Sequence, residues 1–358
     1  MVEPAPSPKA CRRMTRKGWL LFGALSIIWG LPYMLIRVSV REVSPAFLVF
    51  VRTGGAALLL TPLVVRQGRF VESARRVAQH WKAVVIYTFV EIAVPWWLLF
   101  SAEKRVTSSL AGLLVAAVPI AGAVIARLTG SDHLDARRLA GLGLGIAGVA
   151  ALVGLDVGRS SLLAASSFLV IVAGYALGPW ILGRYLSDLP GVTVIASSLV
   201  LCALVYLPLA VAQWPAHPLS ANVLWSMAGL TVLCTAVAFV ALFSLIGEVG
   251  AMRATVVTYL NPAVAVVLGV SVLGEHFGVG GGVGFVCVLG GSYLATRPAK
   301  SPASLAHDAQ LLDAQLGEAQ LLDAQLGEAQ LLGAQLGEAH LEVRLGVAVE
   351  IEESGAGA

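Results

Sequence analysis

Long apolar stretches separated by short polar connections dominate the pattern of this chain. Ten stretches have roughly 20 residues each, the length at which an α-helix crosses a bilayer. Hydrophobic and polar residues do not alternate along them with the period of two that a membrane barrel requires. The pattern therefore predicts an all-α membrane protein with ten transmembrane helices. The expected helices lie at about 18–38, 45–65, 82–101, 107–128, 138–156, 161–182, 191–212, 221–245, 251–273 and 279–296.

The composition supports a membrane protein and excludes an ordinary soluble one. The chain has 358 residues, of which 58% are hydrophobic and 13% are charged. A typical soluble domain has roughly 25% charged residues, so this chain could not hide its apolar surface in an ordinary core. The net charge is +3, and the positive residues lie in the connections, so they bear on how the chain is oriented in the membrane. We therefore expect the lipid bilayer as a partner, and no nucleic acid.

The basic residues predict that both termini lie in the cytoplasm. Residues 1–17 precede the first apolar stretch, which runs well past the length of a signal-peptide core and has no clear cleavage site. We interpret them as a cytoplasmic tail. With ten crossings, seventeen lysines and arginines up to Lys300 fall in cytoplasmic segments and five in outer loops. Lysine and arginine concentrate on the cytoplasmic side of membrane proteins, which favours this orientation in an inner or plasma membrane.

An internal repeat divides the membrane part. The stretches that begin at Ser108 and Ala251 match without a gap at an offset of 143. We expect two five-helix repeats, 18–156 and 161–296. Five is odd, so the halves should have opposite orientations, an architecture of transporters whose site lies where the halves meet. Duplication for packing alone is the alternative, since glycines seven residues apart can mark close helix contacts. The matched pairs include Pro119 with Pro262, Asp132 with Glu275, Gly141 with Gly284, and Gly148 with Gly291.

These residues resemble the EamA-type transporters of the drug/metabolite transporter superfamily. The resemblance covers about 18–296, and its motifs include Trp29-Gly30, Ser44-Pro45 followed by Arg52, and the run "YLNPAVAVVLGVSVLGEHF". It implies ten helices in two inverted repeats and transport of small metabolites, often export of amino acids or related compounds. Two departures stand out: "TGSDHL" replaces the usual Gly-Glu pair, and Asn261 replaces the common Glu before Pro262.

Glu91 is the residue that most directly suggests coupling chemistry. It lies near the middle of the apolar stretch 82–101. A charged group at the bilayer centre costs roughly 2.5 kcal/mol or more, so this carboxyl group should be protonated, paired, or exposed to a watery cavity. One interpretation is a proton-coupling group or a ligand for a substrate amine. The other is a neutral, hydrogen-bonded glutamic acid that joins helices.

Further polar and aromatic residues outline an expected substrate site near the middle of the membrane. Such sites have apolar walls and a few polar contacts. Trp97 could instead anchor its helix at the membrane interface. Prolines can bend a helix towards a cavity, and Arg52 is expected to be structural, or else to meet a substrate carboxylate. The expected substrate-binding residues are Trp29, Tyr33, Glu91, Trp97, Tyr175, Tyr259 and Asn261, and the structural or hinge residues are Pro95, Pro119, Pro262 and Arg52.

The sequence offers no motif for an enzyme, a cofactor or a metal. It has no phosphate-binding loop, no nucleophile elbow and no H-E-x-x-H pattern. The cysteines show no metal-ligand spacing. Asp132-His133 and Glu275-His276 fall in loops on opposite membrane faces, where helix capping or solvated contacts are expected. We expect a non-enzymatic protein with a small-molecule substrate and the proton as a candidate coupling ion.

The tail, 297–358, holds a five-residue repeat such as "DAQLG" and "EAQLL". Five residues advance about 500° around a helix, so the leucines form no stable stripe. The spacing resembles pentapeptide repeats that form a β-helix, but a disordered low-complexity tail is the other interpretation. The chain is therefore expected to be a secondary transporter, an exporter that works by alternating access. The alternative is a membrane-anchored scaffold that acts through this tail.

Overall fold

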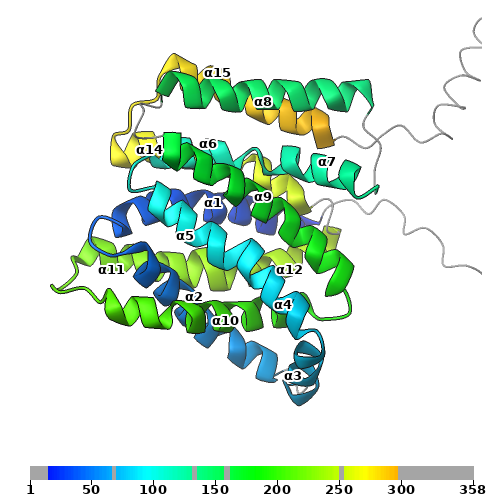
Figure 1. Cartoon of the computed structure of the whole chain (residues 1–358), viewed down its shortest axis with the longest axis vertical. Helices are drawn as coiled ribbons and strands as arrows, with labels where there is room; N and C mark the ends of the chain where they lie inside the picture. Colours follow the sequence, from blue (N-terminus) through cyan, green and yellow to red (C-terminus); the bar gives the residue numbers. More distant parts are fainter. Residues whose placement is uncertain (1–14, 67–69, 131–134, 157–161, 250–253, 297–358) are drawn as a thin grey trace, which may run out of the picture. The chain divides into compact units, whose positions relative to one another are not determined.

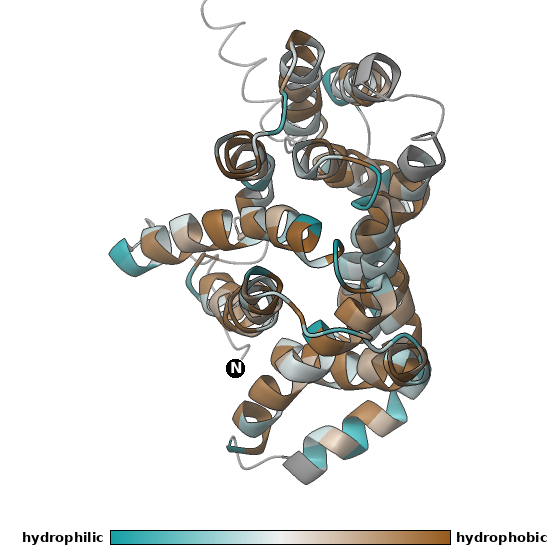
Figure 2. Cartoon of the chain, turned by 90° about the vertical axis from the view of Figure 1, so that its left-hand side faces the viewer, coloured by the Kyte–Doolittle hydropathy of each residue, from teal (hydrophilic) through white to brown (hydrophobic). Residues whose placement is uncertain are grey.

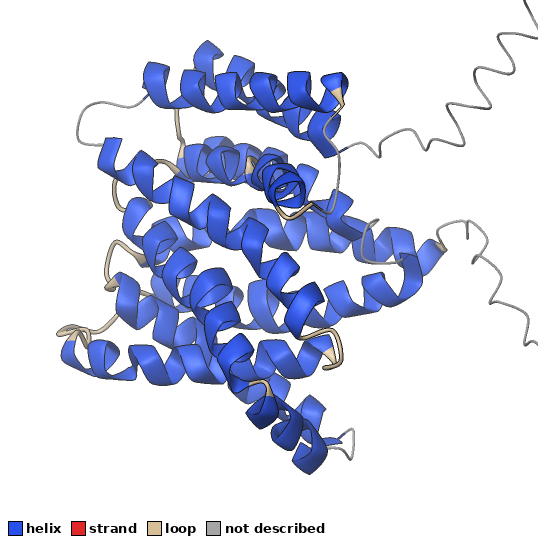
Figure 3. Cartoon of the chain, turned by 45° about the vertical axis from the view of Figure 1, so that its right-hand side comes forward, coloured by secondary structure: helices blue, strands red, loops and turns tan. Residues whose placement is uncertain are grey.

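A computed structural model describes residues 15–66, 70–130, 135–156, 162–249 and 254–296. Within these ranges the chain is entirely helical and contains no strand (Figure 3). The repeats of the tail and the pair Asp132-His133 lie outside the described residues. The first half contains α1 (Arg16–Ser39), α2 (Pro45–Arg66), α3 (Phe70–Gln79), α4 (Trp81–Tyr87), the π-helix η1 (Thr88–Ala93), α5 (Val94–Ala102), α6 (Ser108–Val115), α7 (Val118–Leu128) and α8 (Ala136–Asp156).

The second half repeats this order of helices, except that its described residues form no counterpart of α3. Among the described residues, seven helices are long and apolar enough to cross a membrane, and two shorter apolar helices cover Val257–Leu273 and Val279–Ala295. Hydrophobic residues cover most of the helices, whereas hydrophilic ones concentrate towards their ends (Figure 2). The second half contains α9 (Leu162–Tyr185), α10 (Gly191–Ala212), α11 (Ala221–Ala228), the π-helix η3 (Gly229–Val237), α12 (Ala238–Val249), η4 (Thr255–Tyr259), α14 (Asn261–Leu273) and α15 (Val279–Thr296).

Local sequence explains where several helices begin. The hydroxyls of Thr15 and Thr107 accept hydrogen bonds from the first turns of α1 and α6, at 3.0 Å and 3.2 Å. Pro95, Pro119 and Pro262 each lie in the first turn of a helical segment, α5, α7 and α14, that follows a change in helical geometry. A proline has no N–H to donate, so it fits where the hydrogen-bond pattern of a helix begins or changes.

Helix α3 was not expected from the sequence. It is short and amphipathic, and it contacts α2, α4 and α10 (Figure 1). Its polar residues interrupt the apolar runs on either side, so the apolar pattern assigned it to a loop. An exposed ion pair between Arg76 and Glu72 joins neighbouring turns.

Two of the helix pairs that join the halves pack along much of their length. Helix α2 packs along α10, and α8 packs along α15 (Figure 1). The α8–α15 contact is close because glycines line it. A Cβ atom on Gly291 would lie 2.4 Å from the Gly145 nitrogen, and one on Gly148 would lie 2.8 Å from the Val288 nitrogen. Small residues allow membrane helices to approach at the level of their backbones.

The third long helix of each half contains a π-helix. Shifting η1, residues 88–93, by the sequence offset of 143 gives 231–236, which lies within η3 (Gly229–Val237). Each π-helix carries one residue more than an α-helical turn would hold, and such bulges are frequent at functional sites. The two halves therefore share a local distortion at equivalent positions, as well as a helix order.

Candidate functional site

Arg52 lies at the centre of a buried cluster where the two halves meet. Its side chain is 6% exposed. The Nε group donates a 2.9 Å hydrogen bond to Oγ1 of Thr235, which belongs to the other half. The guanidinium carbon lies 3.8 Å from the ring centre of Trp96 and 5.8 Å from that of Phe100. A cation over an aromatic face is stabilised by the ring quadrupole, so α5 holds the face of this guanidinium.

The π-helix η3 explains why Thr235 can hold Arg52. The Thr235 hydroxyl donates a 2.8 Å hydrogen bond to the carbonyl of Leu230, five residues earlier. This i to i−5 spacing follows the wider turn of the π-helix. The hydroxyl oxygen keeps its acceptor capacity and receives the Arg52 hydrogen bond. Backbone distortion in one half therefore provides the hydrogen-bond partner of a charge in the other.

Glu91 lies in η1, against α9 of the second half. Its Oε2 atom is buried and has no hydrogen-bond partner among the described residues. A Cβ atom on Gly178 would lie 1.7 Å from this oxygen, and one on Gly174 would lie 2.4 Å from the carbonyl oxygen of Val90. Glycine at both positions thus allows η1 and its carboxyl group to approach the α9 backbone.

Two tyrosines connect the surroundings of Arg52 and Glu91. Tyr33 and Tyr175 both lie close enough to Arg52 to interact with its charge, and Tyr175 is also within range of Glu91. Tyr33 is buried, whereas Tyr175 is half-buried. Of the residues that the sequence singled out, the structure therefore brings Tyr33, Arg52, Glu91 and Tyr175 together.

The other predicted site residues have contacts or exposure of their own, and none of these contacts involves Arg52 or Glu91. Trp97 is 41% exposed on α5. Trp29 packs edge-on against Phe239, with ring centres 6.4 Å apart. The Asn261 amide faces the backbone carbonyls of Ser26 and Val257, to which its nitrogen donates at 3.2 Å and 3.0 Å when the amide is oriented to satisfy both. The Tyr259 hydroxyl donates to the Ser292 carbonyl at 3.3 Å.

Sequence reasoning missed Trp96 and Thr235. The Trp96-Trp97 pair was visible, but adjacent residues on a helix point about 100° apart, and only the fold shows which one reaches Arg52. Thr235 gave no signal, because a threonine in an apolar helix usually bonds to its own backbone.

Polar contacts join the connections at one end of the helices, here called the Glu275 end. It comprises the connections 40–44, 103–107, 213–220 and 274–278. Glu275 accepts hydrogen bonds from the Ser108 and Ser109 amides, at 2.7 Å and 2.9 Å, and from the Ser109 hydroxyl at 2.6 Å. The expected capping role of this carboxylate is confirmed, and the capped helix, α6, belongs to the other half.

Glycines position Glu275 for this contact. Gly274 ends α14 with a φ of +67°, a conformation that glycine adopts without strain. The Glu275 amide then donates a 3.0 Å hydrogen bond to the Gly269 carbonyl, which turns the chain back towards α6. A Cβ atom on Gly269 would lie 2.3 Å from the Ser109 hydroxyl oxygen, so glycine also leaves room for the α6 N-terminus.

Glu103 is fully buried at the same end. Arg37 donates a hydrogen bond to its backbone carbonyl, while both carboxyl oxygens have no hydrogen-bond partner among the described residues. Burial raises the pKa of this carboxyl group well above its usual range, because removing water disfavours the charged form. Burial therefore favours the neutral form of Glu103.

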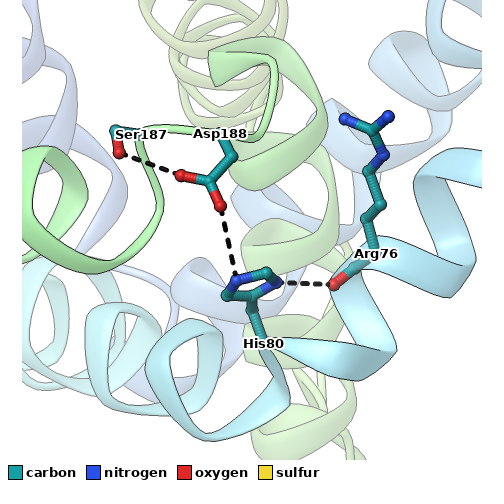
Figure 4. Close-up of polar contacts among 4 residues, drawn as sticks. All are labelled: Arg76, His80, Ser187 and Asp188. Carbon is teal, nitrogen blue, oxygen red and sulfur yellow. Dashed lines mark hydrogen bonds and ion pairs between the residues drawn. The ribbon is translucent and has the colours of Figure 1, made fainter.

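Exposed polar contacts join described residues at the opposite end of the helices, here called the His80 end. His80, between α3 and α4, lies 3.7 Å from a carboxylate oxygen of Asp188, between α9 and α10 (Figure 4). The other ring nitrogen of His80 contacts the Arg76 carbonyl at 3.0 Å, and Ser187 donates to Asp188 at 3.0 Å. Thr15 also donates to Glu248 at 2.6 Å. Exposed contacts of this kind contribute little each, commonly about 0–1 kcal/mol.

Comparison with known proteins places both halves in one family. Residues 16–154 and 162–297 each match the profile of the EamA-like transporter family. An uncharacterized transporter of Archaeoglobus fulgidus is 24% identical over 294 residues, which cover 79% of this chain and 98% of that protein. The uncharacterized inner membrane transporter YedA of Escherichia coli K12 is 28% identical over 268 residues, or 71% of this chain and 83% of YedA.

A solved crystal structure supports the fold. Its chain is 16% identical and has a TM-score of 0.58, with 78% of this chain and 96% of the other covered. At that identity the likeness concerns the fold alone. An uncharacterized transporter of Bacillus subtilis, YdfC, is 26% identical over 255 residues, which cover 69% of this chain and 80% of that protein.

Proposed function

Because the chain belongs to the EamA-like transporter family, a finding consistent with the drug/metabolite transporter superfamily, we propose that it exports a small metabolite as a secondary transporter. It is a multi-pass membrane protein in a family of transporters. The observation that supports a specific site is the Arg52–Thr235 hydrogen bond, which joins the two family repeats through a buried charge. In carriers built from repeats, sites occur where the repeats meet.

The proposed architecture has ten transmembrane helices in two inverted repeats, 18–156 and 161–296. Both termini would be cytoplasmic, with 1–17 and 297–358 as tails. The Glu275 end would then face outwards and the His80 end would face the cytoplasm. Substrate would alternate between the two sides around the Arg52 cluster, with Tyr33, Glu91 and Tyr175 as its contacts. Amino acids and drug-like compounds are the substrate classes to test first.

Reporter fusions test the proposed orientation. Fusions after Arg69 and after Arg138 should report a cytoplasmic location, and a fusion after Lys104 should report the outside, because the basic connections retain their ends of the helices in the cytoplasm. Activity of paired cytoplasmic and periplasmic reporters measures this directly. A cytoplasmic result at Lys104 would contradict the ten-helix, inverted-repeat arrangement.

The polar contacts indicate which side is closed in this conformation. Glu275 forms three part-buried hydrogen bonds with α6, whereas the contacts that the described residues form at the His80 end are more exposed. We propose that the structure represents a state closed at the outer side, in which the Glu275 carboxylate fastens the connection 274–278 to α6. Opening towards the outside must break these bonds.

Glu275→Gln should therefore favour outward opening. Burial raises the pKa of Glu275, but the hydrogen bonds from Ser109 and Ser108 outweigh it and leave this pKa lowered, so the wild-type carboxylate is ionised at neutral pH. A hydrogen bond to a charged group contributes about 1.5–3 kcal/mol, and an amide replaces it poorly, so the open population should rise on the order of tenfold.

Spin labels on Arg105→Cys and Phe277→Cys would measure this opening, since both positions are exposed at the Glu275 end. Ser109→Ala should shift the distance distribution in the same direction but less, because it removes one of the three bonds. Glu72→Gln, on exposed α3, is the matched control and should have no effect. Unchanged distances in Glu275→Gln would show that the contact does not hold the closed state.

Transport by the purified protein is the direct test of the proposed function. Reconstituted vesicles would be screened for uptake and efflux of labelled amino acids and drug-like compounds, with and without an imposed pH gradient. We expect accumulation of at least one compound, stimulated by the gradient. Wild-type protein that moves no compound in either direction, across a broad panel, would overturn the assignment as a carrier.

A further inference from the structure

A pocket at the Glu275 end is lined by positive charge. It has a volume of about 320 Å³ and is lined by Arg37, Val40, Arg41 and Lys104. Three of these four side chains are cationic and none is acidic. In the proposed orientation this is the outer face, where lysine and arginine are sparse in membrane proteins. Three of the five cations assigned to outer loops from the sequence line this one pocket.

Like charges gathered around a concave surface create a local potential. A cleft lined by one sign of charge raises the local concentration of ions of opposite sign and accelerates their association. The basic lining repels organic cations by the same field. An anion is thus the ligand that the outer pocket favours.

Deeper in the protein, the guanidinium of Arg52 keeps N–H donors with which it can bind an anion. Its guanidinium is nine-tenths buried, and its hydrogen bond to Thr235 uses the Nε group alone. Among the described residues no carboxylate forms an ion pair with it. A guanidinium has five N–H donors, so the two terminal nitrogens retain four for another partner. A buried charge without counter-charge is costly, and an anionic ligand would offset that cost.

The neighbouring acids do not supply this counter-charge. Glu103 is within electrostatic range of Arg52, but both of its oxygens are buried without a hydrogen-bond partner in the described part of the chain, and burial favours its neutral form. Glu91 lies against Gly178 of α9 rather than against the guanidinium. The other groups that interact with the Arg52 charge are Tyr33, Tyr175 and Cys234, which are neutral side chains at physiological pH.

We propose that Arg52 binds the carboxylate of the transported substrate. Arg37, Arg41 and Lys104 form an outer binding position on the same transport path. This inference rests on the proposed transport function and adds a substrate class to it: small organic monocarboxylates. Trp96 covers one face of the guanidinium and Thr235 fixes the Nε side, which leaves the two terminal nitrogens for a planar carboxylate. Such paired hydrogen bonds match carboxylate geometry.

The single buried charge favours a monoanion over a dianion. One carboxylate balances one guanidinium, whereas a phosphate monoester would bring about one further negative charge into a site lined by tyrosine and tryptophan. The expected order of binding is therefore carboxylate first, phosphate ester weaker, and neutral amide or amine weakest.

Matched ligands separate charge from shape. Lactate with lactamide, and benzoate with benzamide, would be titrated against the full-length protein in nanodiscs, with thermal unfolding and tryptophan fluorescence as readouts. Wild-type protein should bind at least one carboxylate on the order of 10- to 100-fold more tightly than its amide, the factor that corresponds to a charge-assisted hydrogen bond. Phenyl phosphate and benzylamine test the dianion and the cation.

Variants then assign the preference to residues. Arg52→Gln should remove the preference for the carboxylate, while Arg52→Lys should retain part of it. Because a buried substitution can impair folding, Arg41→Gln and Lys104→Gln provide a second test at exposed positions. Each should weaken carboxylate binding about two- to fivefold and reduce its salt dependence. Arg105→Gln, an exposed neighbour that does not line the pocket, is the matched control and should bind as wild type.

Each outcome bears on one of the two proposals. Wild-type protein that binds amides, amines or phosphate esters as well as carboxylates would overturn the carboxylate site, even if it transports them. Loss of preference in Arg52→Gln, together with weakening in Arg41→Gln but not in Arg105→Gln, would support it. Selective carboxylate binding without any vesicle transport would leave the site standing and overturn the carrier assignment.

Discussion

Glu91→Gln should leave the protein inserted and folded but unable to concentrate its substrate against a gradient. The Glu91 Oε2 atom is buried without a hydrogen-bond partner among the described residues, in a π-helix that packs against α9. An ionised carboxylate is expensive there, so its charge must follow the access of water. We expect this group to take up a proton when the site opens to one side and to release it on the other.

The amide variant keeps the shape of the side chain and removes the proton site. Gradient-driven accumulation in vesicles should fall on the order of 100-fold, while exchange of labelled for unlabelled substrate at equal pH should persist, since exchange requires no proton movement. Cys234, the residue equivalent to Glu91 at the offset of 143, carries no carboxyl group. Glu72→Gln, the same substitution on exposed α3, is the matched control. Its pH profile should be that of wild type.

Glu91 would be a packing residue if the stably inserted Gln variant still accumulated substrate with an unchanged pH profile. Loss of exchange as well as accumulation would assign it to substrate binding instead of coupling. A fluorescence or thermal-unfolding comparison with wild type must accompany both measurements, so that loss of folding is recognised.

Gly291→Ala should destabilise the protein by forcing α15 away from α8. The new Cβ would lie 2.4 Å and 2.6 Å from the nitrogen and Cα of Gly145, and 2.6 Å from the carbonyl oxygen of Gly141. All three contacts are with backbone atoms of α8, which cannot rotate away as a side chain can. The two helices must therefore separate, and overpacking of this kind costs about 1–3 kcal/mol.

Gly290→Ala is the control at the neighbouring position of the same helix. Its Cβ would meet a Leu144 methyl group at 3.8 Å, an ordinary contact. Alanine exceeds glycine in helix propensity by up to about 1 kcal/mol, so Gly290→Ala should be neutral or stabilising. Thermal unfolding in detergent should show a lower midpoint for Gly291→Ala and an unchanged or higher midpoint for Gly290→Ala, each relative to wild type. Equal transitions would show that α8 and α15 do not approach as described.

Helix positions were predictable because the length and apolarity of each run determine them. The expected ranges 45–65 and 191–212 compare with α2 at Pro45–Arg66 and α10 at Gly191–Ala212. The apolar residues that form these helices are the same ones that make them recognisable. Helix α3 escaped prediction because its amphipathic pattern is too short and polar to resemble a membrane span.

The site was only partly predictable, because its partners come together through tertiary structure. Glu91 and Arg52 stood out as charged residues in apolar runs. The sequence favoured a structural role for Arg52 and selected Trp97, whereas Trp96 stacks on the guanidinium. The Thr235 contact requires a π-helical backbone, which composition does not reveal. A charge can thus be noticed in a sequence, but its neighbours depend on how the helices are rotated and where they are distorted.

The π-helices at equivalent positions of the two halves also bear on how the chain evolved. One family profile matches both halves, so the chain carries two copies of one ancestral unit. The distortions fall at equivalent positions, and Thr88 still aligns with Thr231. Two independent insertions of a residue would have had to occur at equivalent positions, whereas one insertion before the duplication explains both π-helices. The ancestral five-helix unit therefore already carried the bulge, and the difference between Glu91 and Cys234 arose later, when the two copies were free to diverge.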